Sequence, residues 1–225
     1  MIKAVLLDVD NTILDFDKCA NVSIKKVCGD VNITYRPEFF PLFTKINDML
    51  WKQVEDKIIT KEQLHSIRFF KVFDAWSVKG DPLDFEKRFK LALRESAEKV
   101  DGALELVKYL SQKYVLAVAS NSNYPQQIKR LTLSGLAPFI HKFFFSGEIG
   151  AEKPSKEFFK ACIDGLGDIK KDEIIVVGDS LNADIKGGID IGIKTCWFNF
   201  RKIDKPLDIN PDFVVNSLDE IKKFL

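Results

Sequence analysis

Five short apolar runs divide the sequence, and each is bounded by residues typical of turns. They are Ile2–Leu7, Tyr114–Ala119, Lys142–Phe145, Ile174–Val177 and Thr195–Phe198. Segments with apolar residues at helical spacing lie between most of these runs. Strands that alternate with helices favour a parallel sheet covered on both faces, so the sequence predicts an α/β, doubly wound (Rossmann-like) fold.

The predicted helices carry start and stop signals. Residues 102–113, 124–136 and 154–166 have helical spacing; Gly135 and Gly167 are expected to end two of these helices, and Pro154 to lie in a first turn. Residues 217–225 are expected to form a last helix, because Ser217 and Glu220 have the spacing of a capping box.

One long stretch interrupts the alternation. Between about residues 17 and 99 no convincing strand is found, but residues 37–58, 60–76 and 81–99 read as helices, the second with Thr60 and Gln63 as a capping box. We therefore expect a helical cap domain, residues 17–99, inserted into a Rossmann-like core formed by residues 1–16 and 100–225.

Composition limits the function classes. The 225 residues include 34 Lys and Arg against 33 Asp and Glu, a net charge of +1, which gives no reason to expect a nucleic-acid or membrane surface. No apolar run is long enough to span a bilayer, and the N-terminus lacks signal-peptide features, so a cytoplasmic location is expected. The four cysteines, Cys19, Cys28, Cys162 and Cys196, form no Cys-x-x-Cys pair and are expected to be reduced.

Polar residues gather where the predicted strands end. Asp8 and Asp10 follow the first run, Ser120 and Asn121 the second, and Asp179 and Asp184 the fourth; Lys153 precedes a helix. In an open parallel sheet, ligands bind beyond the carboxyl ends of the strands. We therefore expect these side chains to form one site.

Such a site needs a cation. Two carboxylates about 4 Å apart repel by roughly 4 kcal/mol at an effective dielectric constant near 20. Oxygen ligands without histidine suit Mg²⁺, which together with Lys153 could hold a phosphate whose oxygens accept from Ser120 and Asn121. One aspartate could then attack phosphorus and its neighbour could transfer protons.

Four short motifs, "DVDNT", "SN", "EKP" and "GDSLNAD", occur in this order between residues 8 and 184. Together they resemble the motifs of the haloacid dehalogenase superfamily. The resemblance implies that Asp8 is the nucleophile and Asp10 the acid–base. Because the dehalogenases of that superfamily lack the second acid, it also implies a phosphatase.

The same resemblance implies the remaining roles. Mg²⁺ would be bound by Asp8, the backbone carbonyl of Asp10 and Asp179. Ser120 and Lys153 would hold the phosphate, and Asp184 would support the metal or Lys153.

The helical insert, with "NDMLWKQVEDKIITKEQLHSIRF", and the late "TCWFN" are similar to the YjjG-like noncanonical pyrimidine 5′-nucleotidases. That likeness implies nucleoside monophosphates as substrates. This chain departs from the branch at Ser120-Asn121-Ser122, where Thr-Asn-Gly is usual, which makes the close backbone approach at residue 122 less certain.

Three residues are candidates for contact with the substrate. Phe16 follows the first motif directly; Trp51 could instead belong to the core of the insert, and Arg68 could instead form a salt bridge within it.

Other functions stay open at the level of sequence. A phosphosugar or phosphoglycolate phosphatase, a phosphomutase, or a non-catalytic binding protein could use the same fold. The expected partner is a small-molecule phosphomonoester, and the sequence does not indicate an oligomeric state.

Overall fold

The computed structural model describes residues 1–204 and 207–225, which divide into two compact units. The sheet unit consists of Met1–Asp15 and Glu98–Leu225, and the helical unit of Phe16–Ala97. The junctions predicted from the sequence, after residues 16 and 99, lie one and two residues further along the chain.

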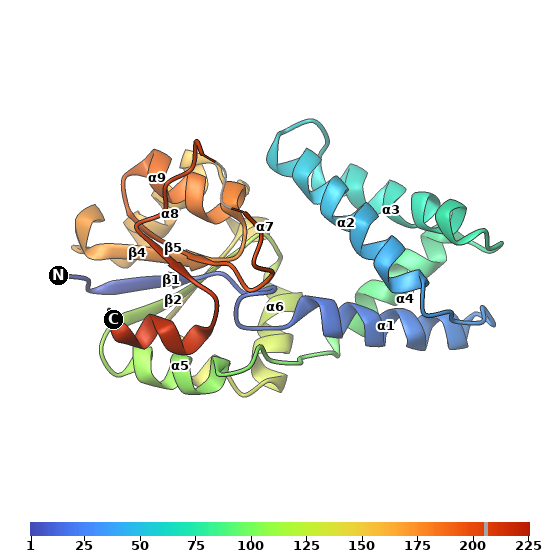
Figure 1. Cartoon of the computed structure of the whole chain (residues 1–225), viewed down its shortest axis with the longest axis horizontal. Coiled ribbons are helices and arrows are strands. Elements are labelled where there is room, and N and C mark those ends of the chain that lie inside the picture. The colour runs from blue at the N-terminus through green and yellow to red at the C-terminus, as the bar shows by residue number, and fades with distance from the viewer. Residues whose placement is uncertain (205–206) are drawn as a thin grey trace. The chain divides into compact units, whose positions relative to one another are not determined.

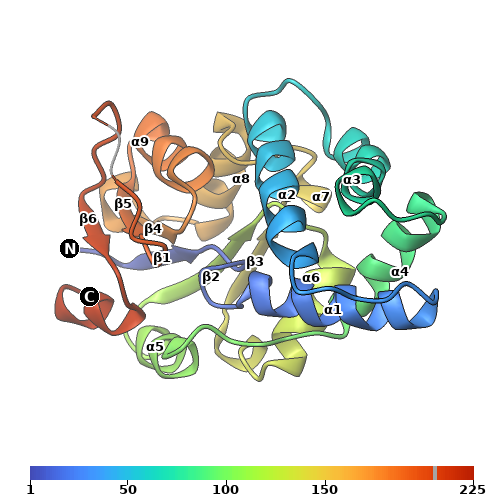
Figure 2. The same ribbon diagram turned by 45° about the vertical axis from the view of Figure 1, so that its right-hand side comes forward.

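The described residues form a six-stranded sheet in which every strand pair is parallel, in the order β3-β2-β1-β4-β5-β6. The strands are β1 (Ala4–Leu7), β2 (Val115–Ser120), β3 (Lys142–Phe145), β4 (Ile174–Gly178), β5 (Lys194–Phe198) and β6 (Phe213–Val215). The predicted α/β doubly wound fold and its five strands are confirmed. The sixth, at the outer edge of the sheet in Figure 2, went unpredicted because it has three residues, two of them exposed.

Alternate residues of the central strand β1 serve two apolar layers. Val5 and Leu7 belong to a core that includes residues of α5 (Ala103–Ser111) and α6 (Tyr124–Leu133). Ala4 and Leu6 belong to a second core with residues of α8 (Lys156–Leu166). Figure 1 shows α5 on one face of the sheet and α8 with α9 (Gly187–Ile191) on the other. Burial on both faces explains why the strand is apolar throughout.

The shorter elements of the sheet unit complete the connections. They are η1 (Ala137–Phe139), α7 (Ser146–Ile149), η2 (Lys171–Glu173), the π-helical η3 (Leu181–Lys186) and the 3₁₀-helical η4 (Leu218–Lys223).

The expected helix ends are partly correct. Gly135 and Gly167 adopt positive φ angles just after α6 and α8, as helix stops do. The prediction for Pro154 is wrong, because α8 begins at Lys156 and its N-cap is Ser155, whose hydroxyl accepts from Phe158 N.

The end of the chain also differs from the prediction. Residues 218–223 form a 3₁₀ helix, and the Ser217 hydroxyl donates to Glu220 Oε1 (3.1 Å) instead of accepting from the backbone. The expected capping box is therefore absent there.

The helical unit contains α1 (Phe16–Asp30), α2 (Phe39–Glu55), α3 (Lys61–Trp76) and α4 (Pro82–Arg94). Residues 16–97, all of which the structure describes, contain no strand, as predicted. The capping box of Thr60 and Gln63 starts α3. Aromatic side chains fill the core; the rings of Phe39 and Trp76 stack with centroids 4.2 Å apart.

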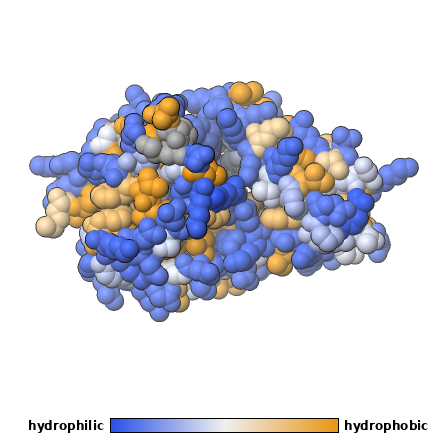
Figure 3. Space-filling model, viewed as in Figure 1, coloured by the Kyte–Doolittle hydropathy of each residue, from blue (hydrophilic) through white to orange (hydrophobic). Residues whose placement is uncertain are grey.

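The surface fits the composition. The face shown in Figure 3 is mainly hydrophilic, with apolar residues in small groups. Among the described residues no helix is both long and apolar enough to cross a membrane. All four cysteines are buried and have free thiols, as expected.

Candidate active site

Three strand ends place the acidic and hydroxyl groups at one edge of the sheet. Asp8 and Asp179 directly follow β1 and β4, which pair with each other, and Ser120 is the last residue of β2, the other neighbour of β1. The strand order reverses between β1 and β4, the position where open α/β sheets bind ligands.

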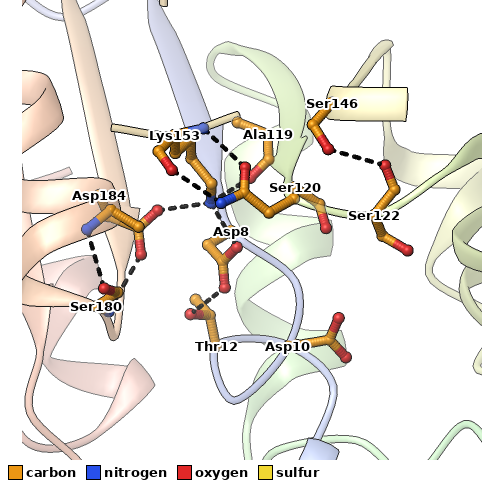
Figure 4. A network of polar contacts seen from close by, with 12 residues as sticks. Asp8, Asp10, Thr12, Ala119, Ser120, Ser122, Ser146, Lys153, Ser180 and Asp184 are labelled. Carbon is orange, nitrogen blue, oxygen red and sulfur yellow. Dashed lines mark hydrogen bonds and ion pairs between the residues drawn. The ribbon is translucent and has the colours of Figure 1, made fainter. Parts of the chain in front are cut away.

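Lys153 lies at the centre of this cluster (Figure 4). Its buried Nζ donates to Asp8 Oδ1 (2.7 Å), to Asp184 Oδ1 (2.6 Å) and to the Ala119 carbonyl (2.8 Å). These contacts use all three N–H groups of the ammonium ion. Burial alone would lower the pKa of Lys153, but the carboxylates of Asp184 and Asp8 raise it above its usual range, so the group stays charged.

Asp8 is held from two sides. Besides the contact with Lys153, its Oδ2 accepts from Thr12 Oγ1 (3.0 Å), and its backbone N–H donates to Val177 O (2.9 Å). Burial raises the pKa of Asp8 to about 7, and Asp184 and Asp10 add to the rise, while Lys153 opposes it. Further positive charge near Asp8 would favour its ionised form.

Asp8, Asp179 and Asp184 form a cluster that could hold a metal ion. One carboxylate oxygen from each lies within 4.8 Å of the others. Burial raises the pKa of Asp179 well above its usual value, and the charges of Asp8 and Asp184 add to this effect. Three carboxylates face one lysine, so this all-oxygen site is short of positive charge and fits a hard divalent cation.

The turn after β4 shapes the acidic cluster. Asp184 Oδ2 accepts from Ser180 N (3.1 Å), and a Cβ atom at Gly178 would lie 2.1 Å from the same oxygen. Only glycine therefore leaves room for Asp184. The Asp179 carbonyl accepts from the indole N–H of Trp197 in β5 (2.9 Å), which fixes the turn from the next strand.

Ser120 and Asn121 have different surroundings. Ser120 is buried. Gln127 links it to Asp10, because Gln127 Nε2 donates both to the Ser120 hydroxyl (3.2 Å) and to Asp10 Oδ2. The Asn121 side chain holds the backbone of Lys153 from both ends: Oδ1 accepts from Lys153 N (2.8 Å) and Nδ2 donates to Lys153 O (3.0 Å). The Asn121 amide therefore orients Lys153, and its contact with phosphate stays a prediction.

Asp10 points away from the Lys153 contacts in Figure 4. Its Oδ1 accepts from Arg130 Nη1 (2.5 Å) and its Oδ2 from Gln127 Nε2 (2.7 Å). Its carboxylate is thus separate from the acidic cluster. Metal binding by its backbone carbonyl stays a prediction.

The three candidates in the helical unit have distinct environments. Phe16, the first residue of α1, is partly buried, and Trp51 is partly buried against the small cluster of Leu50, Val54 and Leu64. Arg68 is buried and donates to both carboxylate oxygens of Glu86 (3.1 and 2.7 Å). Of the two roles that the sequence left open for Arg68, the internal salt bridge is the one present.

Sequence reasoning missed four residues of this site: Thr12, Gln127, Arg130 and Gly178. Thr12 and Gly178 lie within the quoted motifs, which are themselves a signal. Gln127 and Arg130 lie three positions apart on α6, so two polar side chains occupy its buried face. That departure from an apolar stripe is a weaker signal, because a helix boundary is needed to see it.

Comparisons with known proteins identify relatives of this chain. Residues 2–192 match the family model of haloacid dehalogenase-like hydrolases. The HAD-hydrolase YfnB of Bacillus subtilis is 31% identical over 223 residues, which cover 99% of this chain and 95% of YfnB. A crystal structure of YfnB, bound to magnesium, superimposes with a TM-score of 0.95 and covers 100% of this chain and 98% of that one.

Two further relatives are similar over almost their full length. Pyrimidine 5′-nucleotidase PynA of Streptococcus pneumoniae is 29% identical, covering 97% of this chain and 93% of PynA. Pyrimidine 5′-nucleotidase YjjG of Escherichia coli is 27% identical, covering 98% and 96%. Together with the match to the family model, these similarities show that the chain belongs to the haloacid dehalogenase-like hydrolases, in the branch that resembles YjjG.

Proposed function

We propose that the chain is a Mg²⁺-dependent phosphomonoesterase that forms an aspartyl phosphate on Asp8 and prefers pyrimidine nucleoside 5′-monophosphates. The observation that carries this proposal is the pair of acids on one loop with opposite surroundings. Asp8 is buried against Lys153, whereas Asp10 is one-third exposed and bound by an amide and a guanidinium group. Groups with different environments suit different chemical tasks.

The reaction has two steps. An oxygen of Asp8 attacks phosphorus, the bond from phosphorus to the ester oxygen breaks, and the Asp10 carboxyl gives its proton to the departing alkoxide. Water then attacks the phosphorus of the aspartyl phosphate, the bond from phosphorus to the Asp8 oxygen breaks, and the Asp10 carboxylate takes a proton from the water. Inorganic phosphate leaves, and both acids return to their starting forms.

The acidic cluster supports the choice of cofactor. Asp8 and Asp179 would hold Mg²⁺, with Asp184 nearby, and the bound ion would supply positive charge to the nucleophile and to the phosphate oxygens. Lys153 and Ser120 would bind phosphate. Because every N–H of Lys153 Nζ already has an acceptor, phosphate binding to Lys153 requires one of those contacts to be exchanged.

Similarity to PynA and YjjG supports the choice of substrate. Within the helical unit, Phe16 is our first candidate for stacking on the base, since it follows the sheet unit directly. Base–aromatic stacking is worth about 1–3 kcal/mol in single-stranded nucleic-acid complexes. Trp51 is a second candidate, and Arg68, held by Glu86, is assigned to the interior of the unit.

A substrate panel tests the proposal. Purified protein is assayed with UMP, dUMP, dTMP, purine nucleotides, phosphosugars, phosphoglycolate and p-nitrophenyl phosphate, with Mg²⁺ and with EDTA. We expect Mg²⁺-dependent release of phosphate, the highest kcat/KM for the pyrimidine nucleotides, and none of this in Asp8→Asn. Equal or better turnover of phosphosugars or phosphoglycolate refutes the nucleotidase assignment, transfer of phosphate between sugars indicates a mutase, and no turnover of any ester indicates a binding protein.

The role of Phe16 has its own test. Phe16→Ala is expected to lower kcat/KM for UMP by about 5- to 150-fold, the equivalent of 1–3 kcal/mol, and to change p-nitrophenyl phosphate turnover little. Phe70→Ala is the matched control, because Phe70 is exposed on α3. Equal losses for both substrates would remove Phe16 from base recognition.

A further inference from the structure

Two polar side chains of α6 are completely buried although a helix normally buries its apolar face. Gln127 and Arg130 lie three positions apart, so they share one side of the helix, and both have 0% exposure. Burying an amide and a guanidinium group costs several kcal/mol unless both find hydrogen-bond partners. The hydrogen-bond partners of these two side chains therefore indicate why the side chains are buried.

Asp10 is the shared partner. Arg130 Nη1 donates to Asp10 Oδ1 (2.5 Å) and to Gln127 Oε1 (3.1 Å). Gln127 Nε2 donates to Asp10 Oδ2 (2.7 Å) and to the Ser120 hydroxyl (3.2 Å). The chain of contacts runs from Arg130 through Gln127 to Ser120, and both oxygens of Asp10 are attached to it.

The helix that presents these two side chains is itself fixed at its start. The Asn123 side chain caps it by accepting from Gln126 N (3.1 Å). The Glu148 carboxylate of α7 accepts from Tyr124 N with both oxygens (3.0 and 3.1 Å). The N-terminal turn of α6 therefore has little freedom to move relative to the end of β2, where Ser120 lies.

We propose that Gln127, oriented by Arg130, is a positioning residue that holds the Asp10 carboxyl at a fixed place beside the Ser120 hydroxyl for proton transfer to the leaving group. This inference rests on the proposed phosphomonoesterase function, which assigned no role to either residue. Nitrogen donors on both oxygens of Asp10 stabilise the negative charge that develops as its proton moves to the ester oxygen. Ser120, at the other end of the Gln127 amide, is the hydroxyl assigned to phosphate.

The dependence on leaving group separates positioning from simple packing. A leaving group such as p-nitrophenolate departs without a proton, whereas phenolate and alkoxides need one. Loss of a positioned acid therefore lowers the rate in proportion to how basic the leaving group is. A packing defect at Gln127 lowers the rate for all esters alike.

The test compares Gln127→Met with Gln126→Met, a change of the same residue type at the next position of α6, with its side chain only partly buried. kcat and KM are measured for aryl phosphates from p-nitrophenyl to phenyl phosphate and for UMP, at saturating Mg²⁺. In Gln127→Met we expect a loss on the order of tenfold in kcat/KM, which covers the steps up to departure of the leaving group, for phenyl phosphate and UMP, a part of the roughly 10²–10⁴ that general acid catalysis supplies, and almost none for p-nitrophenyl phosphate. Gln126→Met should match the wild type throughout.

Three further arms make the outcome decisive. Arg130→Lys should keep more of the phenyl phosphate activity than Arg130→Met. A double variant with Gln127→Met and Asp10→Asn should depend on the leaving group in the same way as Asp10→Asn alone. Gln127→Asn, which keeps the amide on a shorter arm, replaces Gln127→Met if the latter does not fold. A uniform loss across all esters overturns the inference and leaves the phosphatase intact, whereas a wild type without turnover overturns the proposed function and this inference with it.

Discussion

At the scale of residues, the site is a set of buried charges that depend on one another. Lys153 has 2% side-chain exposure and contacts Asp8 and Asp184, whose side chains are 10% and 1% exposed. Removing one partner of such a group leaves an uncompensated charge and costs about 3–5 kcal/mol. Variants that keep the shape of a side chain are therefore the informative ones.

Asparagine at positions 8 and 10 should separate the roles of the two acids. Asp8→Asn is expected to abolish turnover, because an amide cannot form the aspartyl phosphate. Asp10→Asn is expected to lose a factor of about 10²–10⁴ with poor leaving groups. Values of kcat/KM, which cover the steps up to the aspartyl phosphate, should show partial rescue of Asp10→Asn, and none of Asp8→Asn, by p-nitrophenyl phosphate. Equal rescue of both variants would mean that the roles are misassigned.

Gly178→Ala should damage the site through sterics alone. The new Cβ would lie 2.1 Å from Asp184 Oδ2 and 2.2 Å from its Cγ, so Asp184 must move away from Lys153. We expect a loss of about 1–3 kcal/mol in the free energy of unfolding together with loss of activity. Gly29→Ala is the control, since Gly29 lies at an exposed position of α1 where a Cβ meets nothing within 4 Å, and urea denaturation compares the two. A stable, active Gly178→Ala protein would contradict the geometry.

At the scale of elements, a buried ion pair joins two helices of the helical unit. Arg68 of α3 binds Glu86 of α4 and also donates to Asn47 Oδ1 of α2 (2.9 Å). His65, one turn before Arg68, places Nδ1 3.2 Å from Glu86 Oε1. The packing of α2, α3 and α4 thus depends on the charges of Arg68 and Glu86.

His65 gives this ion pair a pH dependence. Burial lowers the pKa of His65, helped by Arg68 and Lys90 and opposed by Glu86. Histidine in the unfolded chain has a pKa of about 6.5. As pH falls through that value, His65 therefore binds a proton in the unfolded chain before it does so in the folded chain, and the stability that neutral His65 provides is lost. Compared with His65→Gln, the wild type should lose stability between pH 8 and pH 5 in urea denaturation. A difference that does not change with pH contradicts this.

At the scale of the whole molecule, the polar site is built from distant parts of the sequence. The site lies in the sheet unit, whose strands β1 and β2 are separated in sequence by the entire helical unit. Asp8 precedes the insertion, whereas Ser120, Lys153 and Asp179 follow it. A cation bound by the acidic cluster would therefore link the start of the chain to its C-terminal half.

Magnesium should stabilise the protein against heat. Binding to the folded state alone contributes about 2.7 kcal/mol at a concentration 100 times the Kd, and each kcal/mol raises Tm by about 2–4 °C at this chain length. Asp179→Asn should reduce the Mg²⁺-dependent shift and raise the Tm of the metal-free protein slightly, because repulsion with Asp8 and Asp184 is relieved. Asp172→Asn, at an exposed position before β4, should behave as the wild type in scanning calorimetry. An unchanged shift in Asp179→Asn removes it from the metal ligands.

Sequence patterns alone predicted five of the six described strands, the helices between them and the residues that gather at the strand ends. Short apolar runs and helical spacing are local signals, and the carboxyl ends of parallel strands must share one edge, so Asp8, Ser120 and Asp179 could be grouped from the sequence alone. Local signals fail where an element is short: three residues of β6 carry too little pattern, and at residues 217–225 the sequence of a capping box formed a different contact.

The pairing of polar groups with one another could be seen only in the folded chain. The Asn121 amide holds Lys153, Arg68 holds Glu86, and Gln127 with Arg130 holds Asp10, in each case across 18 or more positions of the sequence. A buried polar group without a hydrogen-bond partner costs free energy, so each group binds a partner that the fold brings within hydrogen-bonding distance. The spacing of residues along the sequence does not show which polar groups become neighbours in the fold.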